Sequence, residues 1–361
     1  MIRLTRPVIG DSERAAVDAV LASGMLVQGE QVAAFEARLA ALCGRRHAVA
    51  VASGTTALEL ALEVLGIGPG DEVLVPALTW PSPAHAVLRR GAVPVLVDVD
   101  PHEWNATEAG FAAVRTARTR LAVVIDQFGN PARARAIEGA LDGVPILEDA
   151  ACALGSHFPG APCGSLGPIA CMSFHPRKIV TTGEGGACLL DDDALAERLR
   201  VLRNHGQQAP GRFASAAGNH RMTELAAALG LAQLDRLDAI IAARRERAAR
   251  YRDALPMLSF QAVPEGARST YQTLGVRLRT TRTGAAAARE RDDVVQALRA
   301  RGVEAGLLSY ALHRVGTIPG PHGPLPGTEA VADTGLALPL FPALTERDQR
   351  TVIDQVREVL A

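Results

Sequence analysis

Short apolar runs alternate along the first part of the chain with segments whose apolar residues recur at helical spacing. Residues 11–43 predict two amphipathic helices that separate at Ser23 and Gly24. Uniformly apolar runs at 73–75 and 93–97 flank a helical segment, and two more runs of this kind follow. Strands that are apolar on both faces are typical of a parallel sheet covered by helices. The pattern therefore predicts an α/β domain.

The pattern changes towards the C-terminus. Residues 218–255 predict a glycine-asparagine turn and then one long helix that is capped near Thr223. A strand at 271–278 and two amphipathic helices follow. We expect a large domain of residues 1–255, which includes the N-terminal helices, and a smaller C-terminal α/β domain of residues 256–361.

The composition narrows the class of protein. With 48% hydrophobic residues, 21% charged residues and a net charge of -1, the chain resembles a soluble globular protein and gives no reason to expect nucleic acid as a partner. No apolar run approaches the length of a membrane span, and the N-terminus lacks the apolar core of a signal peptide. We therefore expect a cytoplasmic protein without a membrane partner.

The cysteines and histidines show no metal-binding spacing. Five cysteines occur without a CxxC pair, so they are interpreted as small buried hydrophobic residues rather than as disulfides or zinc ligands. The nine histidines are scattered along the chain. No metal site is predicted.

Lys178 is the only lysine in the chain, because the other 37 of the 38 basic residues are arginines. A guanidinium stays protonated, whereas a lysine amine can lose its proton and condense with an aldehyde to form a Schiff base. Lys178 is therefore interpreted as a chemically active residue. The alternative is a surface lysine that persists by chance.

The residues around Lys178 support a covalently held cofactor. Apolar runs at 170–174 and 181–190 predict two buried strands with the lysine on the loop between them. Ser173 offers a hydroxyl group, and glycines at 183, 185 and 186 allow close backbone approaches. These features suit pyridoxal 5'-phosphate (PLP), which binds lysine through its aldehyde and needs a carboxylate near its ring nitrogen.

Three other positions match the needs of this cofactor. An apolar strand runs into Ser53-Gly54-Thr55-Thr56 at the start of a helix, where backbone amides and the helix dipole favour an anion. Asp149 ends a predicted strand and could pair with a pyridinium, and Trp80 follows another strand and could stack on the ring. The alternatives are a helix cap without a ligand, an N-cap aspartate, and a core or interface anchor.

A family resemblance runs from SGMLVQGEQVAAFE at 23–36 to LTERDQ at 344–349, and eight motifs in order carry it. They are SGTTALELAL, GIGPGDEVLVP, PALTW, ILEDAACALGS, GSLG, SFHPRKIVTTGEGG, NHRMTELAAALGLAQLDRL and LALPLFPALTERD. The chain resembles the DegT/StrS-type aminotransferases, which are fold-type I PLP enzymes that aminate nucleotide-linked keto-sugars and related keto-cyclitols. The resemblance implies a mostly parallel central sheet flanked by helices, a smaller C-terminal domain, and a homodimer.

The resemblance also implies roles for individual residues. Lys178 binds the cofactor aldehyde, and Asp149 pairs with the ring nitrogen. The cofactor-binding set that it implies is Gly54, Thr55, Thr56, Trp80, Asp149, Cys152, Ser173, Lys178 and Asn219, with Asn219 supplied by the partner subunit. Arg221, also from the partner subunit, and His313 are implied to contact the substrate.

The chain departs from the family pattern near the expected substrate. Cys152 stands where many members have glutamine or glutamate, and residues 126–130 read DQFGN where members often read HLYGQ. The loop at 316–327 is rich in proline where many members have aromatic residues. These departures leave the expected cofactor chemistry intact and concern the identity of the substrate.

We therefore expect a PLP-dependent aminotransferase that moves an amino group from glutamate or glutamine to a keto-sugar, most simply a nucleotide-linked keto-deoxyhexose. The arginine and alanine richness hints at an antibiotic-sugar pathway. A keto-cyclitol acceptor and a non-catalytic ligand-binding or regulatory member of the fold are the alternatives. A PLP-dependent sugar dehydratase fits less well, because those relatives carry histidine at the position of Lys178.

Overall fold

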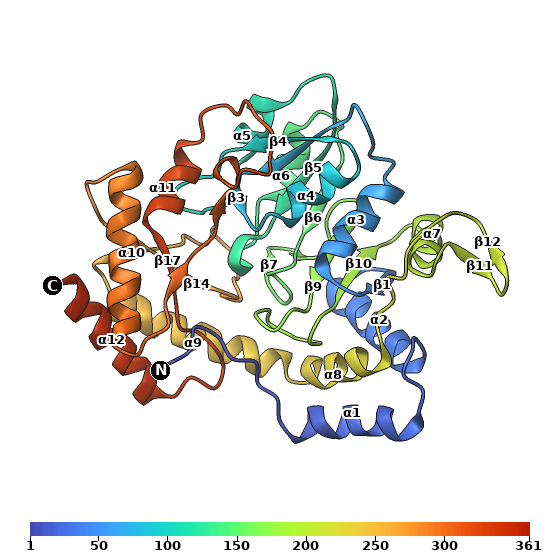
Figure 1. The fold of residues 1–361 in the computed structure, drawn as a ribbon, viewed down its shortest axis with the longest axis horizontal. Coiled ribbons are helices and arrows are strands. Elements are labelled where there is room, and N and C mark those ends of the chain that lie inside the picture. The colour runs from blue at the N-terminus through green and yellow to red at the C-terminus, as the bar shows by residue number, and fades with distance from the viewer.

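A seven-stranded sheet organises the large domain of the computed structural model, which describes residues 1–361 (Figure 1). The strand order is β1 (His47–Val51), β10 (Gly186–Leu190), β9 (Ile169–Ser173), β6 (Ile146–Asp149), β5 (Thr119–Ile125), β2 (Glu72–Pro76) and β4 (Val93–Val97). Strand β10 is antiparallel to β1 and β9, and the other neighbours are parallel. The predicted mostly parallel sheet is confirmed.

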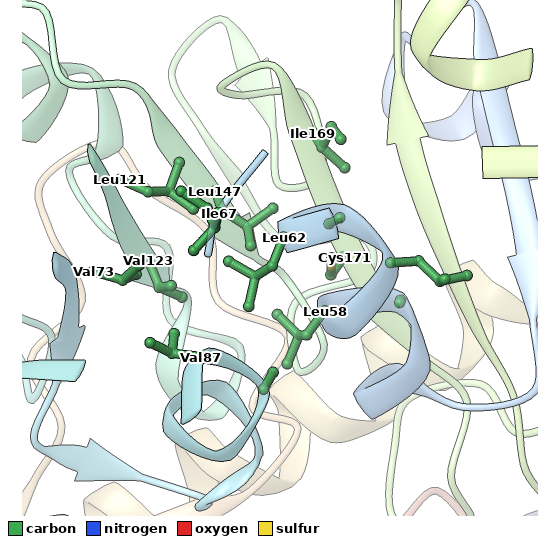
Figure 2. Packing of buried hydrophobic residues seen from close by; sticks show 14 of the residues in the cluster. Leu58, Leu62, Ile67, Val73, Val87, Leu121, Val123, Leu147, Ile169 and Cys171 are labelled. Carbon is green, nitrogen blue, oxygen red and sulfur yellow. The ribbon is translucent and has the colours of Figure 1, made fainter. Parts of the chain in front are cut away.

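Both faces of this sheet are covered, which explains why its strands are uniformly apolar. One face packs against α3 (Gly54–Val64), α4 (Ser82–Arg89) and α7 (Asp193–Arg203). Figure 2 shows Leu58 and Leu62 of α3 pointing towards Leu147 and Cys171 of the sheet. Burying one such leucine side chain contributes about 1.5–3 kcal/mol, so this contact fixes the position of the start of α3.

Helices from distant parts of the chain cover the other face. They are α2 (Glu30–Cys43), α5 (Glu108–Val114), α6 (Ala134–Ala140), α8 (Glu224–Leu234) and the first turns of α9 (Leu237–Ala254), and α1 (Asp11–Ser23) packs against α8. The two predicted N-terminal helices are confirmed, and they separate at Ser23 and Gly24 as expected. None of the helices is long and apolar enough to cross a membrane.

The prediction of one long helix up to residue 255 is wrong, because α8 and α9 are separate helices. They separate at Asp235 and Arg236, where Arg236 has φ -108° and ψ 5°. The Arg236 guanidinium lies 2.9 Å from the carboxylate of Glu13, which is fully buried in α1. This ion pair ties the junction to α1. The predicted cap at Thr223 is confirmed, since its side chain accepts a hydrogen bond from the backbone of Ala226.

A second sheet lies in the C-terminal part of the chain. Its strands are all antiparallel, in the order β13 (Leu258–Phe260), β14 (Leu274–Leu278), β17 (Gly335–Leu338) and β15 (Gly306–Leu307). Helices α10 (Gly284–Ala300) and α12 (Glu346–Leu360) pack on it and share its hydrophobic core. Helix α9 contributes Ile240 to the core of the large domain and Tyr251 to this second core. The domain boundary near residue 256 stays a prediction.

The remaining elements are short. They are β3 (Leu78–Thr79), η1 (Gln127–Gly129), β7 (His157–Phe158), β8 (Ala161–Pro162), β11 (Gln207–Ala209), β12 (Arg212–Phe213), β16 (Tyr310–Ala311), η2 (Leu312–Arg314) and α11 (Pro326–Thr334). Strands β16 and β3 pair with each other, so the C-terminal segment is attached beside the sheet of the large domain. Strands β11 and β12 form a hairpin that projects from the molecule near α7 (Figure 1).

Candidate active site

The carboxyl ends of four strands that run in the same direction bring the predicted chemical residues to one edge of the large sheet. Strand β6 ends at Asp149 and β9 ends at Ser173. Strand β1 leads directly into the Ser53–Thr56 segment, which we call the anion loop, and β2 leads through β3 to Trp80. Ligands of open α/β sheets bind outside the carboxyl ends of the strands. The structure therefore places this site where such a fold binds ligands.

Lys178 lies half-buried on the connection between β9 and β10, as predicted. Its amine donates a hydrogen bond to the Sγ atom of Cys152 over 3.1 Å. The turn that carries it is held by a bond from the Lys178 backbone to the carbonyl of His175 (2.8 Å) and by Gln272 Nε2, which donates to the carbonyl of Arg177 (2.6 Å). The lysine amine is thus held next to the thiol of Cys152.

Two glycines allow residues 173–186, which we call the lysine segment, to contact the anion loop. A Cβ atom on Gly54 would lie 2.7 Å from the Cβ of Ser173, and one on Gly186 would lie 2.3 Å from the carbonyl oxygen of Ser53. Either contact is too short for a side chain. Glycine is therefore required at both positions to bring Ser173 against the start of α3.

The anion loop has the geometry that its sequence predicts. Ser53 caps α3, and its Oγ accepts a hydrogen bond from the backbone of Thr56 over 3.1 Å. The hydroxyl of Thr55 lies 2.9 Å from that of Ser82, which begins α4. Hydroxyl groups, backbone amides and the positive end of the α3 dipole thus meet beside Ser173, as a bound phosphate requires.

Asp149 is the buried carboxylate of the site, with 6% of its surface exposed. Burial raises its pKa, and the hydrogen bond from the backbone of Ala151 (3.1 Å) and the charge of Lys178 offset this only in part. A carboxylate that is removed from water with a single hydrogen bond is stabilised by a cationic donor beside it. A protonated ring nitrogen would provide that partner.

Trp80 does not act as a core anchor, because 62% of its surface is exposed. Its ring meets that of Tyr310 edge to face with centroids 5.4 Å apart. The pairing of Tyr310 with Thr79 between β16 and β3 creates this contact. Sequence reasoning missed Tyr310, because nothing in its local pattern indicates that a residue so distant in sequence lies beside Trp80.

Asn219 and Arg221 do not contact Lys178 or Asp149 within the subunit. Their segment lies against the end of β1, where the backbone of Ala52 donates to the carbonyl of His220 (2.9 Å). The Arg221 guanidinium bonds to the side chain of Asn204, and Asn219 is exposed. Their implied roles stay predictions.

His313 also stays a prediction as a substrate residue. Its Nε2 atom lies 3.2 Å from a carboxylate oxygen of Glu329, and its Nδ1 atom is buried without a hydrogen-bond partner. Neither contact places it beside Lys178.

Comparisons with known proteins match the chain over almost its whole length. Residues 7–357 match the DegT/DnrJ/EryC1/StrS aminotransferase family. The chain belongs to this family. It is 38% identical to the GDP-perosamine synthase of Caulobacter vibrioides over 341 residues, which cover 92% of this chain and 91% of the relative.

Solved structures agree with this assignment. The aminotransferase TlmJ from Streptoalloteichus hindustanus superposes with a TM-score of 0.93 and 37% identity, over 100% of this chain and 99% of that one. DesV from S. venezuelae superposes with a TM-score of 0.87 and 35% identity, over 96% and 93% of the two chains. The fold-type I class predicted from the sequence is confirmed.

The aminotransferase uses PLP, as its family does. The site fits the cofactor on its own geometry, because Gly54 leaves room for the anion loop to meet Ser173 and Asp149 is a buried carboxylate with one hydrogen bond. Lys178 lies close enough to Asp149 for its charge to lower the pKa of that carboxyl. Cys152, whose Sγ accepts the hydrogen bond from the Lys178 amine, stands where many members of the family have glutamine or glutamate.

Two further carboxyl groups, one directly after β5 and one on the neighbouring strand β6, lie near Asp149, and the sequence pattern did not predict that they meet. Asp126 and Glu148 are buried, and a carboxyl oxygen of one lies within 4.8 Å of a carboxyl oxygen of the other. Burial raises the pKa of Glu148, and the hydrogen bonds that it accepts from the backbones of Gly164 and Leu166, both 2.8 Å long, offset this in part. Burial and the charge of Glu148 raise the pKa of Asp126 well above its ordinary value. Asp126 accepts one backbone hydrogen bond and Glu148 accepts two, so Asp126 is the carboxyl that keeps its proton to the higher pH.

The raised pKa of Asp126 predicts that the stability of the fold depends on pH. In the unfolded chain Asp126 loses its proton near pH 4, whereas in the folded protein it keeps the proton to a higher pH, so the free energy of unfolding falls as pH rises through that window. Asp126→Asn keeps a donor to Glu148 and removes the titration. The loss of stability as pH rises above about 4 should be smaller in this variant, by up to about 1.4 kcal/mol for each pH unit in which the proton is retained.

Urea denaturation at several pH values measures this difference. The exposed Asp253 provides the matched control, since Asp253→Asn makes the same chemical change in solvent and should keep the wild-type slope. Equal slopes for Asp126→Asn and the wild type would show that the pair holds no proton.

Proposed function

We propose that this aminotransferase moves an amino group from glutamate or glutamine to a nucleotide-linked keto-sugar. The observation that carries the proposal is the single lysine beside a buried carboxylate at the ends of parallel strands. The sugar is suggested by the GDP-perosamine synthase relative, whose sequence is 38% identical across most of both chains. We also propose a cytoplasmic location, on the basis of the 48% hydrophobic and 21% charged composition.

Each site residue has a part in this reaction. When bound, PLP supplies an aldehyde and an electron-withdrawing ring. Lys178 Nζ would hold the cofactor at its aldehyde carbon, and the free amine would move a proton to and from the substrate carbon that bears the nitrogen. Asp149 holds the proton on the ring nitrogen, and the anion loop with Ser173 binds the phosphate. Trp80 offers an exposed ring face, and Cys152 Sγ accepts a hydrogen bond from the lysine amine.

We further propose that the active unit is a homodimer in which Asn219 and Arg221 reach the partner's site. Their segment is close to surfaces that a monomer would leave exposed. Met25 and Val27, between α1 and α2, are 68% and 60% exposed, and Phe213 on the projecting β11–β12 hairpin is 62% exposed (Figure 1). Large apolar side chains on a projecting hairpin and a neighbouring loop suit burial against a second subunit.

The first prediction concerns Lys178. Borohydride reduction of the purified protein should fix the cofactor on one peptide, which contains Lys178, and Lys178→Arg should abolish turnover because a guanidinium cannot form the Schiff base. Peptide mass spectrometry measures the label. As a control, Arg289→Lys introduces a second lysine on an exposed face of α10 and should leave the label where it was. A label on the N-terminal amine, or on the new lysine, would refute the assignment.

The second prediction concerns the composite site. Lys178→Ala subunits and Asn219→Ala/Arg221→Ala subunits are each expected to be inactive. After subunit exchange, half of the dimers in an equal mixture contain both kinds of subunit, and each mixed dimer has one intact site. About a quarter of the wild-type activity should therefore return. No recovery after exchange has been demonstrated by mass spectrometry would rule out the shared site.

A further inference from the structure

A cavity of about 480 Å³ opens beside α9, outside the site described above. Arg245, Ala249 and Arg252 of α9 form one wall. The connection between β13 and β14 forms the other through residues 263–271. The function proposed above assigns no role to this cavity.

The charged side chains that line the cavity are all positive. They are Arg245, Arg252 and Arg268. The charge of Arg268 lowers the pKa of Arg245 in addition to the effect of burial, and no carboxylate acts on Arg245. Arg245 and Arg268 also lower the pKa of His157, whose backbone pairs with that of Arg268. The guanidinium groups of Arg245 and Arg268 are therefore close enough to repel each other.

The guanidinium groups are held by the backbone rather than by acidic partners. Arg245 Nε donates to the carbonyl of Ser269 over 2.9 Å, and its Nη2 atom is buried without a partner. Arg252 Nη2 donates to the carbonyl of Gln261 over 3.3 Å, and its guanidinium lies 5.7 Å from the ring centroid of Phe260. Each group is thus oriented while some of its N–H donors remain free.

Such an arrangement favours a ligand with more than one negative charge. Arg245 and Arg268 repel each other, and an anion bound beside them removes that cost. The guanidinium fork matches the oxygens of phosphate, which carries up to two charges where a carboxylate carries one. Half of the lining is apolar, including Ala249, Val263 and Ala267, and leaves room for a further part of the ligand.

The cavity is connected to the lysine segment through two adjacent residues. Tyr271 lines the cavity, and its neighbour Gln272 donates to the carbonyl of Arg177 over 2.6 Å. Arg244, next to Arg245 on α9, donates to the carbonyls of both Tyr271 and Gln272 (3.2 and 3.0 Å). A ligand in the cavity therefore contacts the segment that supports the turn of Lys178.

We propose that this cavity binds the phosphate groups of a small phosphate-bearing ligand through Arg245, Arg252 and Arg268. Two sources share this chemistry. One is the nucleoside diphosphate part of the sugar substrate, which rests on the function proposed above. The other is a free phosphate compound, for which inorganic pyrophosphate is the simplest representative.

Calorimetric titration of the PLP-loaded protein tests the proposal, because the cofactor then occupies its own phosphate site. The probes are inorganic pyrophosphate and, separately, UDP, GDP and dTDP. Arg245→Gln and Arg268→Gln should each weaken the affinity about tenfold, as expected for one lost charged hydrogen bond. Arg289→Gln makes the same charge change on the exposed face of α10, away from the cavity, and should bind like the wild type.

The two sources give different results. A nucleoside diphosphate that binds more tightly than pyrophosphate, and that loses affinity in both variants, indicates the substrate. Equal affinities for pyrophosphate and all three nucleotides indicate a site for free phosphate compounds. Absence of binding to the wild type, or unchanged affinity in variants with wild-type melting curves, overturns the proposal.

Because Arg268 is exposed, Arg268→Gln should fold normally, and its affinity alone tests the proposal if Arg245→Gln fails to fold. Amine transfer from glutamate to the bound cofactor needs no ligand in this cavity. Its rate in the wild type therefore tests the proposed function separately from phosphate binding.

Discussion

The chemistry of this protein depends on one buried carboxylate. Asp149 ends a central strand and has little exposed surface, and its pKa is raised because burial outweighs the bond from Ala151 and the charge of Lys178. The folded chain therefore keeps an acidic group at the sheet edge with fewer partners than it needs. Burial makes the charged form of Asp149 unfavourable when it has no cationic partner. The same burial strengthens its attraction to a cation bound beside it.

Close backbone packing builds the rest of the site around that carboxylate. Gly54 and Gly186 have no Cβ atoms, so the start of α3 lies directly against Ser173 and the lysine segment can turn back into β10. Leucines on α3 anchor that helix to the sheet (Figure 2). Packing thus fixes the distance between the phosphate site and Lys178. A reaction on a small cofactor requires such a fixed distance, because the reacting atoms must be held in position.

Local sequence patterns predict the parts of the site that each depend on one segment. The apolar strands, the Ser53 cap and the position of Lys178 between two strands follow from periodicity, capping chemistry and the count of lysines. Contacts between distant segments do not follow from such patterns. The edge-to-face contact of Trp80 with Tyr310, the proximity of the buried Asp126 and Glu148, and the cluster of cavity arginines depend on pairings that exist only in the folded chain.

The most direct test of this account is the rate of amine transfer from glutamate in Asp149→Asn, followed by the loss of the cofactor's visible absorbance after rapid mixing. Asparagine keeps the shape and loses the charge. If the buried carboxylate holds the proton on the ring nitrogen, the variant should still bind PLP, and the transfer should slow by about 100-fold or more. Equal rates in the variant and the wild type would contradict the account.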